Sequence, residues 1–133
     1  MVNYILFILM AENIVKNKSF EFAIRIVKLY QFLCSDKKEY VLSKQLLRSG
    51  TAVGALVHEA EHAESKSDFK HKMCIAQKEI NESIYWLELL KKTGYLTDTQ
   101  FKSINKDSVE IIKLITSIIK SIKLNSTKIR TPH

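Results

Sequence analysis

The chain has 133 residues, 46% of them hydrophobic and 26% charged, which is typical of one ordered globular domain and excludes a disordered chain. It contains 3 glycines and 1 proline, and Pro132 lies at the C-terminal end, so long helices can run without interruption. The net charge of +7 favours anionic partners, nucleic acid first, although a lysine-rich solvated surface explains the same charge.

The first ten residues, MVNYILFILM, are apolar but too short to span a bilayer, and they lack the features of a secretory signal. Residues 1–12 are therefore interpreted as an apolar arm that packs on the protein or on a neighbouring subunit, with a start at Met10 as the alternative. Cys34 and Cys74 lie in separate apolar segments and predict buried thiols in a reducing compartment. We expect a cytoplasmic protein without a membrane partner.

Residues 13–34 carry two neighbouring apolar stripes at helical spacing. One stripe consists of Phe20, Ala23, Ile24 and Val27. The second consists of Phe22, Ile26, Leu29 and Leu33. A helix that is apolar over so much of its circumference is expected to be buried on more than one side.

Residues 39–64 predict a second helix that contains Gly50 and Gly54 one turn apart. Each glycine costs a helix about 1 kcal/mol relative to alanine, so a compensating gain is required. Glycines at this spacing let helix backbones approach closely. We therefore expect a neighbouring helix to pack tightly against this pair.

Two further helices are predicted over residues 67–93 and 97–124, with Ser67 as the N-cap of the first of them. Gly94 is placed to end that helix. Thr97 and Gln100 have the spacing of a capping box at the start of the last helix.

Four long helices with short turns predict an all-α, antiparallel up-down-up-down four-helix bundle that occupies residues 1–133 as one domain. The polar, basic tail over residues 125–133 is expected to fray. The first and last helices carry more apolar surface than a bundle of this size needs. This excess predicts a subunit interface.

The string His58-Glu59-Ala60-Glu61-His62 matches the H-E-x-x-H zinc motif. In a metal-dependent hydrolase, His58 and His62 bind the metal and Glu59 acts as the general base. A third ligand is also required, and proximity in sequence makes Glu64, Asp68 and His71 the candidates for it. The competing interpretation is a polar helix face that matches the motif by chance and needs no cofactor.

Gln45, Arg48, Glu59 and Glu82 are interpreted as a structural polar network, because acids inside a bundle need hydrogen-bonding partners. A di-iron site requires a Glu-x-x-His motif from each of two helices. The third helix offers Glu79 and Glu82 without a histidine, so this site is incomplete.

The C-terminal part of the chain from Ile111 onward has no acidic residue. Its basic residues are Lys113, Lys120, Lys123, Lys128 and Arg130. This segment is the first candidate for contact with the phosphate backbone of RNA or DNA.

Several motifs together resemble one known family. They include Lys18-Ser19-Phe20-Glu21-Phe22-Ala23, Gln45-Leu46-Leu47-Arg48-Ser49-Gly50-Thr51, Gly54-Ala55, Trp86-Leu87 and Thr93-Gly94-Tyr95. From about Glu12 to Lys123 the chain resembles the S23-like four-helix-bundle proteins encoded in intervening sequences of bacterial 23S ribosomal RNA genes. The resemblance implies an antiparallel bundle, assembly into rings that are typically homopentamers, and a role in nucleic-acid binding, in a family for which no enzymatic activity is established. We expect no catalytic activity and no cofactor.

The chain departs from that family where Ala52 replaces the usual serine and Leu56 replaces the usual asparagine, which implies a thinner polar network at the bundle centre. The favoured function is a non-catalytic homo-oligomeric bundle that binds nucleic acid or assists assembly. The alternative is the metal-dependent hydrolase described above.

Overall fold

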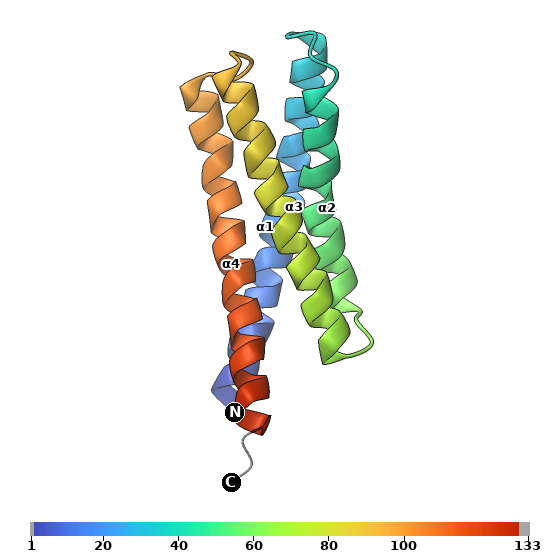
Figure 1. Ribbon diagram of the computed structural model, residues 1–133, viewed down its shortest axis with the longest axis vertical. Coiled ribbons are helices and arrows are strands. Elements are labelled where there is room, and N and C mark those ends of the chain that lie inside the picture. The colour runs from blue at the N-terminus through green and yellow to red at the C-terminus, as the bar shows by residue number, and fades with distance from the viewer. Residues whose placement is uncertain (1, 131–133) are drawn as a thin grey trace.

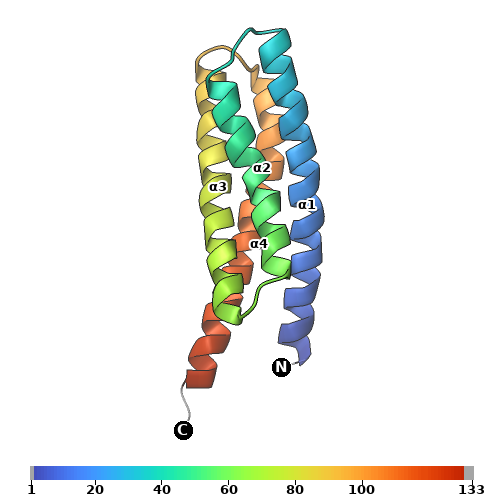
Figure 2. The same cartoon turned by 90° about the vertical axis from the view of Figure 1, so that its right-hand side faces the viewer.

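The computed structural model is a bundle of four α-helices joined by short turns (Figures 1 and 2). It describes the backbone of residues 2–130 and the side chains of residue 3 and of residues 5–123. The helices are α1 (Val2–Ser35), α2 (Leu42–Glu61), α3 (Lys66–Lys92) and α4 (Asp98–Arg130). Each helix packs against its neighbours in sequence, and α4 closes the bundle against α1. The predicted antiparallel four-helix bundle is confirmed.

The first and last helices, α1 and α4, are longer than predicted. The residues interpreted as a separate arm, 1–12, form the start of α1 from Val2 onward. No glycine or proline separates them from the rest of the helix, and Ile8 and Ala11 continue its core-facing side. At the other end α4 continues through Arg130, so most of the predicted frayed tail is helical backbone.

α2 is shorter than predicted because Glu39 folds back over its N-terminus. The buried Glu39 carboxylate accepts the backbone N–H groups of Val41, Leu42 and Ser43, with 2.9 Å between the Val41 nitrogen and Oε1. These are donors that the first turn of a helix leaves without partners. The segment from residue 39 to residue 41 is therefore a capping loop, and α2 begins at Leu42.

The ends of α3 and α4 test the predicted caps. Ser65 is the N-cap of α3, since its side chain accepts the Asp68 N–H at 3.0 Å, and the prediction of Ser67 is wrong. Gly94 follows the end of α3 with a φ of +88°, as predicted for a glycine at this place. The capping box of Thr97 and Gln100 is confirmed by reciprocal backbone-to-side-chain bonds of 2.9 and 3.1 Å.

The two helical glycines lie where α1 crosses α2. A Cβ atom at Gly50 would stand 2.8 Å from Cγ1 of Ile26, and one at Gly54 would stand 3.1 Å from the Ser19 carbonyl oxygen. Such distances are shorter than ordinary carbon contacts. The expected tight packing against the glycine pair is confirmed, and α1 is the helix that makes it.

Neither a membrane span nor a disulfide contributes to the described part of the fold. Among the residues that the structure describes, no helix is both long and apolar enough to cross a membrane. Cys34 and Cys74 are both free and half-buried, on α1 and α3 respectively. Stability therefore rests on apolar packing and on polar contacts between helices.

Candidate functional site

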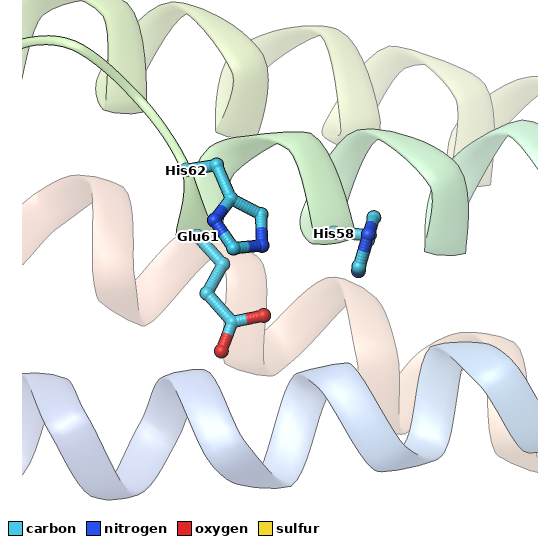
Figure 3. Close-up of side chains that lie close together, drawn as sticks. All are labelled: His58, Glu61 and His62. Atoms are coloured by element: carbon cyan, nitrogen blue, oxygen red, sulfur yellow. The ribbon is translucent and has the colours of Figure 1, made fainter.

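The His58–His62 pair lies on the exposed surface near the C-terminal end of α2 (Figure 3). The imidazole centroids are 5.3 Å apart in an edge-to-face arrangement. The third member of this cluster is Glu61, and the possible ligand atoms of the three residues lie within 4.8 Å of one another. The structure thus places a different glutamate beside the histidines from the one that the zinc motif names.

Glu59 points to the other side of α2. Its Oε2 atom lies 3.4 Å from Nζ of Lys72 on α3, in an ion pair at the edge of the α2–α3 interface. The helical period separates Glu59 from the histidine face, because Glu61 and His58 stand one turn apart on the side toward α1. The predicted roles of two metal ligands with Glu59 as their general base do not match this arrangement.

Glu61 is held by Lys16 of α1, whose Nζ lies 2.8 Å from Oε2. The hydrogen bond from Lys16 lowers the pKa of the Glu61 carboxyl below its ordinary value, and the nearby histidines act in the same direction. Glu12 lies nearby on α1, and its pKa is raised, first by burial and then by the charge of Glu61. Two carboxylates and one ammonium group therefore lie together between α1 and α2, from Glu12, Glu61 and Lys16.

The predicted polar network is only partly assembled. Arg48 donates to Glu79 at 3.2 Å and also to Glu82, so it links α2 to α3. Glu59 belongs to a separate ion pair with Lys72. Gln45 is exposed, and its side chain makes no hydrogen bond within the described residues.

Small polar groups complete the contact between α2 and α3 inside the bundle. The Ser83 hydroxyl donates to Ser49 Oγ at 3.0 Å, and both side chains are fully buried. This pair was not among the contacts predicted from the sequence. The sequence feature that could have indicated the pair is a serine at a core-facing helical position, since Ser49 shares a face with Leu46 and Val53 and a buried hydroxyl needs a hydrogen-bonding partner.

The outer face of α4 carries a line of lysines. Lys113 and Lys120, both predicted as basic contacts, are exposed, and Lys106 and Lys102 lie on the same face about two and three turns before Lys113. Within the described side chains, none of these lysines is in an ion pair. Lys102 to Lys120 span about 27 Å of helix. We call Lys102, Lys106, Lys113 and Lys120 the lysine face.

The remaining predicted basic residues divide into two groups. Lys123 is exposed and lies beside the lysine face. The side chains of Lys128 and Arg130 lie outside the described residues. Lys102 and Lys106 were not predicted as basic contacts, because acidic residues occur near them in the sequence. Their helical spacing from Lys113 is the signal that places them on one face. Of the nearby acids, Glu110 forms an ion pair with Lys18 on α1, with 2.9 Å between Oε2 and Nζ.

The outer face of α1 is apolar although it faces away from the bundle. Of the two stripes predicted on this helix, the second supplies the core residues Phe22, Ile26 and Leu33, whereas Phe20 of the first is 67% exposed. The exposed face has a regular spacing of four and three residues. We call it the outer seam, and it consists of Leu6, Met10, Asn13, Asn17, Phe20, Ile24, Val27 and Gln31.

A groove runs between α1 and α2 along one edge of the outer seam. Phe20 and Asn17 line it from α1, and Gly54 and His58 line it from α2. The groove places the histidine cluster next to the outer seam.

Comparisons with known proteins identify the relatives of this fold. The family described as 23S rRNA-intervening sequence protein matches residues 11–117. A crystal structure of a protein with unknown function from the S23 ribosomal protein family of Bacteroides thetaiotaomicron VPI-5482 is 59% identical, with a TM-score of 0.82. The similarity covers 83% of this chain and 98% of that one. No curated protein matches the chain. The chain belongs to the family of 23S rRNA-intervening sequence proteins.

Proposed function

We propose that this protein is a non-catalytic assembly module whose copies associate through the outer seam. The observation that carries the proposal is a continuous line of exposed, uncharged side chains on the side of α1 opposite the core. Its four-and-three spacing is that of the heptad contacts by which helices pack against one another. Exposed apolar surface of this extent and regularity is rare on monomers and marks interaction sites.

A second copy of this chain is the partner that fits the seam best. The chain carries a net charge of +7, so copies repel one another wherever charged faces meet. The seam positions themselves carry no charge, which makes this face the least repulsive contact. Asn13 and Asn17 lie between two apolar stretches, and polar residues at such positions select one register. Parallel copies of α1 around a ring axis satisfy this geometry, in line with the pentamer that the family resemblance implies.

The mass of the particle in solution tests this proposal. By light scattering coupled to gel filtration, the wild type is expected at a multiple of 15.4 kDa. The double substitution Phe20→Glu and Ile24→Glu places charges in the seam and should give the 15.4 kDa monomer with unchanged helicity. Tyr85→Glu is the matched control, because Tyr85 is 59% exposed on α3, away from the seam. A monomeric wild type contradicts the proposal.

The lysine face favours a second function, the binding of nucleic acid. Its lysines form no ion pair within the described residues, although the charges of Lys106 and Lys113 act on Glu110, the ion-pair partner of Lys18. They are aligned over about 27 Å of helix, a length that spans several phosphates of a nucleic-acid backbone. Contacts of this kind carry affinity without base specificity. Binding is therefore expected to be independent of sequence and strongly salt-dependent.

Fluorescence anisotropy with labelled RNA and DNA duplexes at several salt concentrations tests this second function. Changing Lys106, Lys113 and Lys120 to glutamine should weaken binding and reduce the salt slope by about one per lysine. The control changes Lys44, Lys78 and Lys92 to glutamine. These exposed lysines lie on α2 and α3, so the net charge changes equally while the lysine face is kept. Equal losses in both variants contradict a dedicated binding face.

A further inference from the structure

The cluster of His58, Glu61 and His62 contains the side chains that divalent transition metals bind. Imidazole nitrogens and carboxylate oxygens are ordinary ligands of zinc, at about 2.0–2.2 Å from the metal. Two histidines one helical turn apart present their rings on the same side of the helix. In this protein both histidines and the carboxylate are exposed on that side, so no core packing has to change for them to converge.

The distances in the cluster are compatible with closure around one ion. Ligand atoms that share a tetrahedral metal are about 3.3 Å apart for bonds of that length. The ligand atoms here lie within 4.8 Å of one another, and exposed side chains change rotamer freely. Lys16 binds Glu61 through both carboxylate oxygens, at 2.8 and 3.1 Å, so one oxygen can turn to the metal while the other keeps the ion pair.

We propose that His58, Glu61 and His62 form a surface binding site for Zn²⁺ or a similar first-row divalent cation. The site differs from the H-E-x-x-H interpretation in both its third residue and its role. Glu59 is engaged by Lys72 and supplies no general base, and the site is open to solvent. Three protein ligands leave coordination positions for water. The role that we assign to the site is metal binding without hydrolysis, and the proposal does not rest on the proposed self-association.

Calorimetric titration of the chelator-treated full-length protein with ZnCl₂ tests the site. The wild type should bind one ion per chain. His58→Ala and His62→Ala should each weaken binding by at least tenfold, since even the loss of a residue that only orients a metal ligand costs about 10–100-fold. Glu61→Gln should also weaken binding, because an amide oxygen is a poorer ligand than a carboxylate, but by less than the histidine variants, because that oxygen can still coordinate the metal. All the substituted side chains are exposed, so helicity should be unchanged.

Two control variants distinguish this site from its alternatives. His71→Ala removes an exposed histidine of α3 outside the cluster and should leave the affinity unchanged. Glu59→Gln should also leave the affinity unchanged, because Glu59 pairs with Lys72 outside the cluster. Cobalt(II) absorption provides a second readout, since thiolate ligation by Cys34 or Cys74 adds intense charge-transfer bands. The proposal is overturned by unaltered affinity in the His58→Ala and His62→Ala double variant, or by cobalt bands of thiolate origin.

Discussion

At the scale of single residues, the contact between α1 and α2 depends on the missing side chains of Gly50 and Gly54. Ile26 is fully buried, and its branched side chain fills the space beside Gly50. The backbone of Ser19 takes the equivalent place at Gly54. A helix would gain from alanine at either position, so the glycines are retained for their packing.

Gly50→Ala should destabilise the fold by about 1 kcal/mol, because overpacking costs about 1–3 kcal/mol and the better helix propensity of alanine returns about 1 kcal/mol. The physical cause is the 2.8 Å approach of the new Cβ to Ile26. Urea denaturation of a double-mutant cycle checks it. Gly50→Ala should become neutral or stabilising in the Ile26→Ala background, and an equal cost in both backgrounds contradicts this origin.

Glu12 provides a prediction of pH dependence. Burial and the charge of Glu61 raise its pKa above the ordinary value of 4.5, so ionised Glu12 disfavours the folded state. The penalty is complete above the raised pKa and vanishes as the pH falls below 4.5. Glu12→Gln should therefore increase the free energy of unfolding at pH 7 by less than about 0.5 kcal/mol and raise the melting temperature. The difference in melting temperature between the variant and the wild type should disappear near pH 3. Thermal melts over this pH range measure it, and a difference that grows on acidification is inconsistent with the assignment.

At the scale of elements, α1 and α2 differ in how their ends are determined. α1 extends from Val2 without a break, because no glycine or proline interrupts it. α2 instead begins where the Glu39 carboxylate accepts hydrogen bonds from the first backbone N–H groups of the helix. The same loop contains Lys38, whose φ of 55° lies in the left-handed region. The turn before α2 is thus held together by the hydrogen bonds of the Glu39 side chain.

Glu39→Ala should cost about 1.5–3 kcal/mol, the range for hydrogen bonds to a charged group, because it leaves backbone donors at the start of α2 without their acceptor. Glu39→Gln should cost less, since the amide oxygen still accepts. Chemical denaturation measures both variants. Hydrogen exchange at the Val41, Leu42 and Ser43 amides should accelerate in Glu39→Ala, and unchanged protection there would show that the carboxylate is not their partner in solution.

At the scale of the whole molecule, apolar and basic faces point away from the core in different directions. The outer seam belongs to α1 and the lysine face to its neighbour α4 (Figure 1). Arg25 joins the two helices through Asp107 at 2.6 Å. Assembly through the seam would bring lysine faces of several copies onto one particle and multiply their electrostatic contribution.

Self-association through the seam makes stability depend on protein concentration. The melting temperature of the wild type should rise with concentration, because association stabilises the folded state by mass action. The double variant Phe20→Glu and Ile24→Glu should show no such dependence. Differential scanning calorimetry over a hundredfold range of concentration checks this, and a constant melting temperature for the wild type is the contrary result.

Local signals in the sequence were sufficient for the bundle, the Gly94 terminus and the capping box at Thr97, because helical periodicity and capping involve residues within a few positions of one another. The close approach at Gly50 and Gly54 was also predictable, since glycine in a helix needs a compensating contact. The identity of the helix that makes this contact, α1, was not predictable, because periodicity does not say which helix lies opposite.

Folding of the four helices together decided the rest. Two equally apolar stripes on α1 are indistinguishable in sequence, and only packing against α2 and α4 makes one of them core and leaves the other as the outer seam. The ion-pair partners of the two glutamates near the histidines were decided in the same way. The helical period alone puts Glu61 beside His58 and His62. Only the fold shows that Lys16 of α1 pairs with Glu61 and that Lys72 of α3 pairs with Glu59.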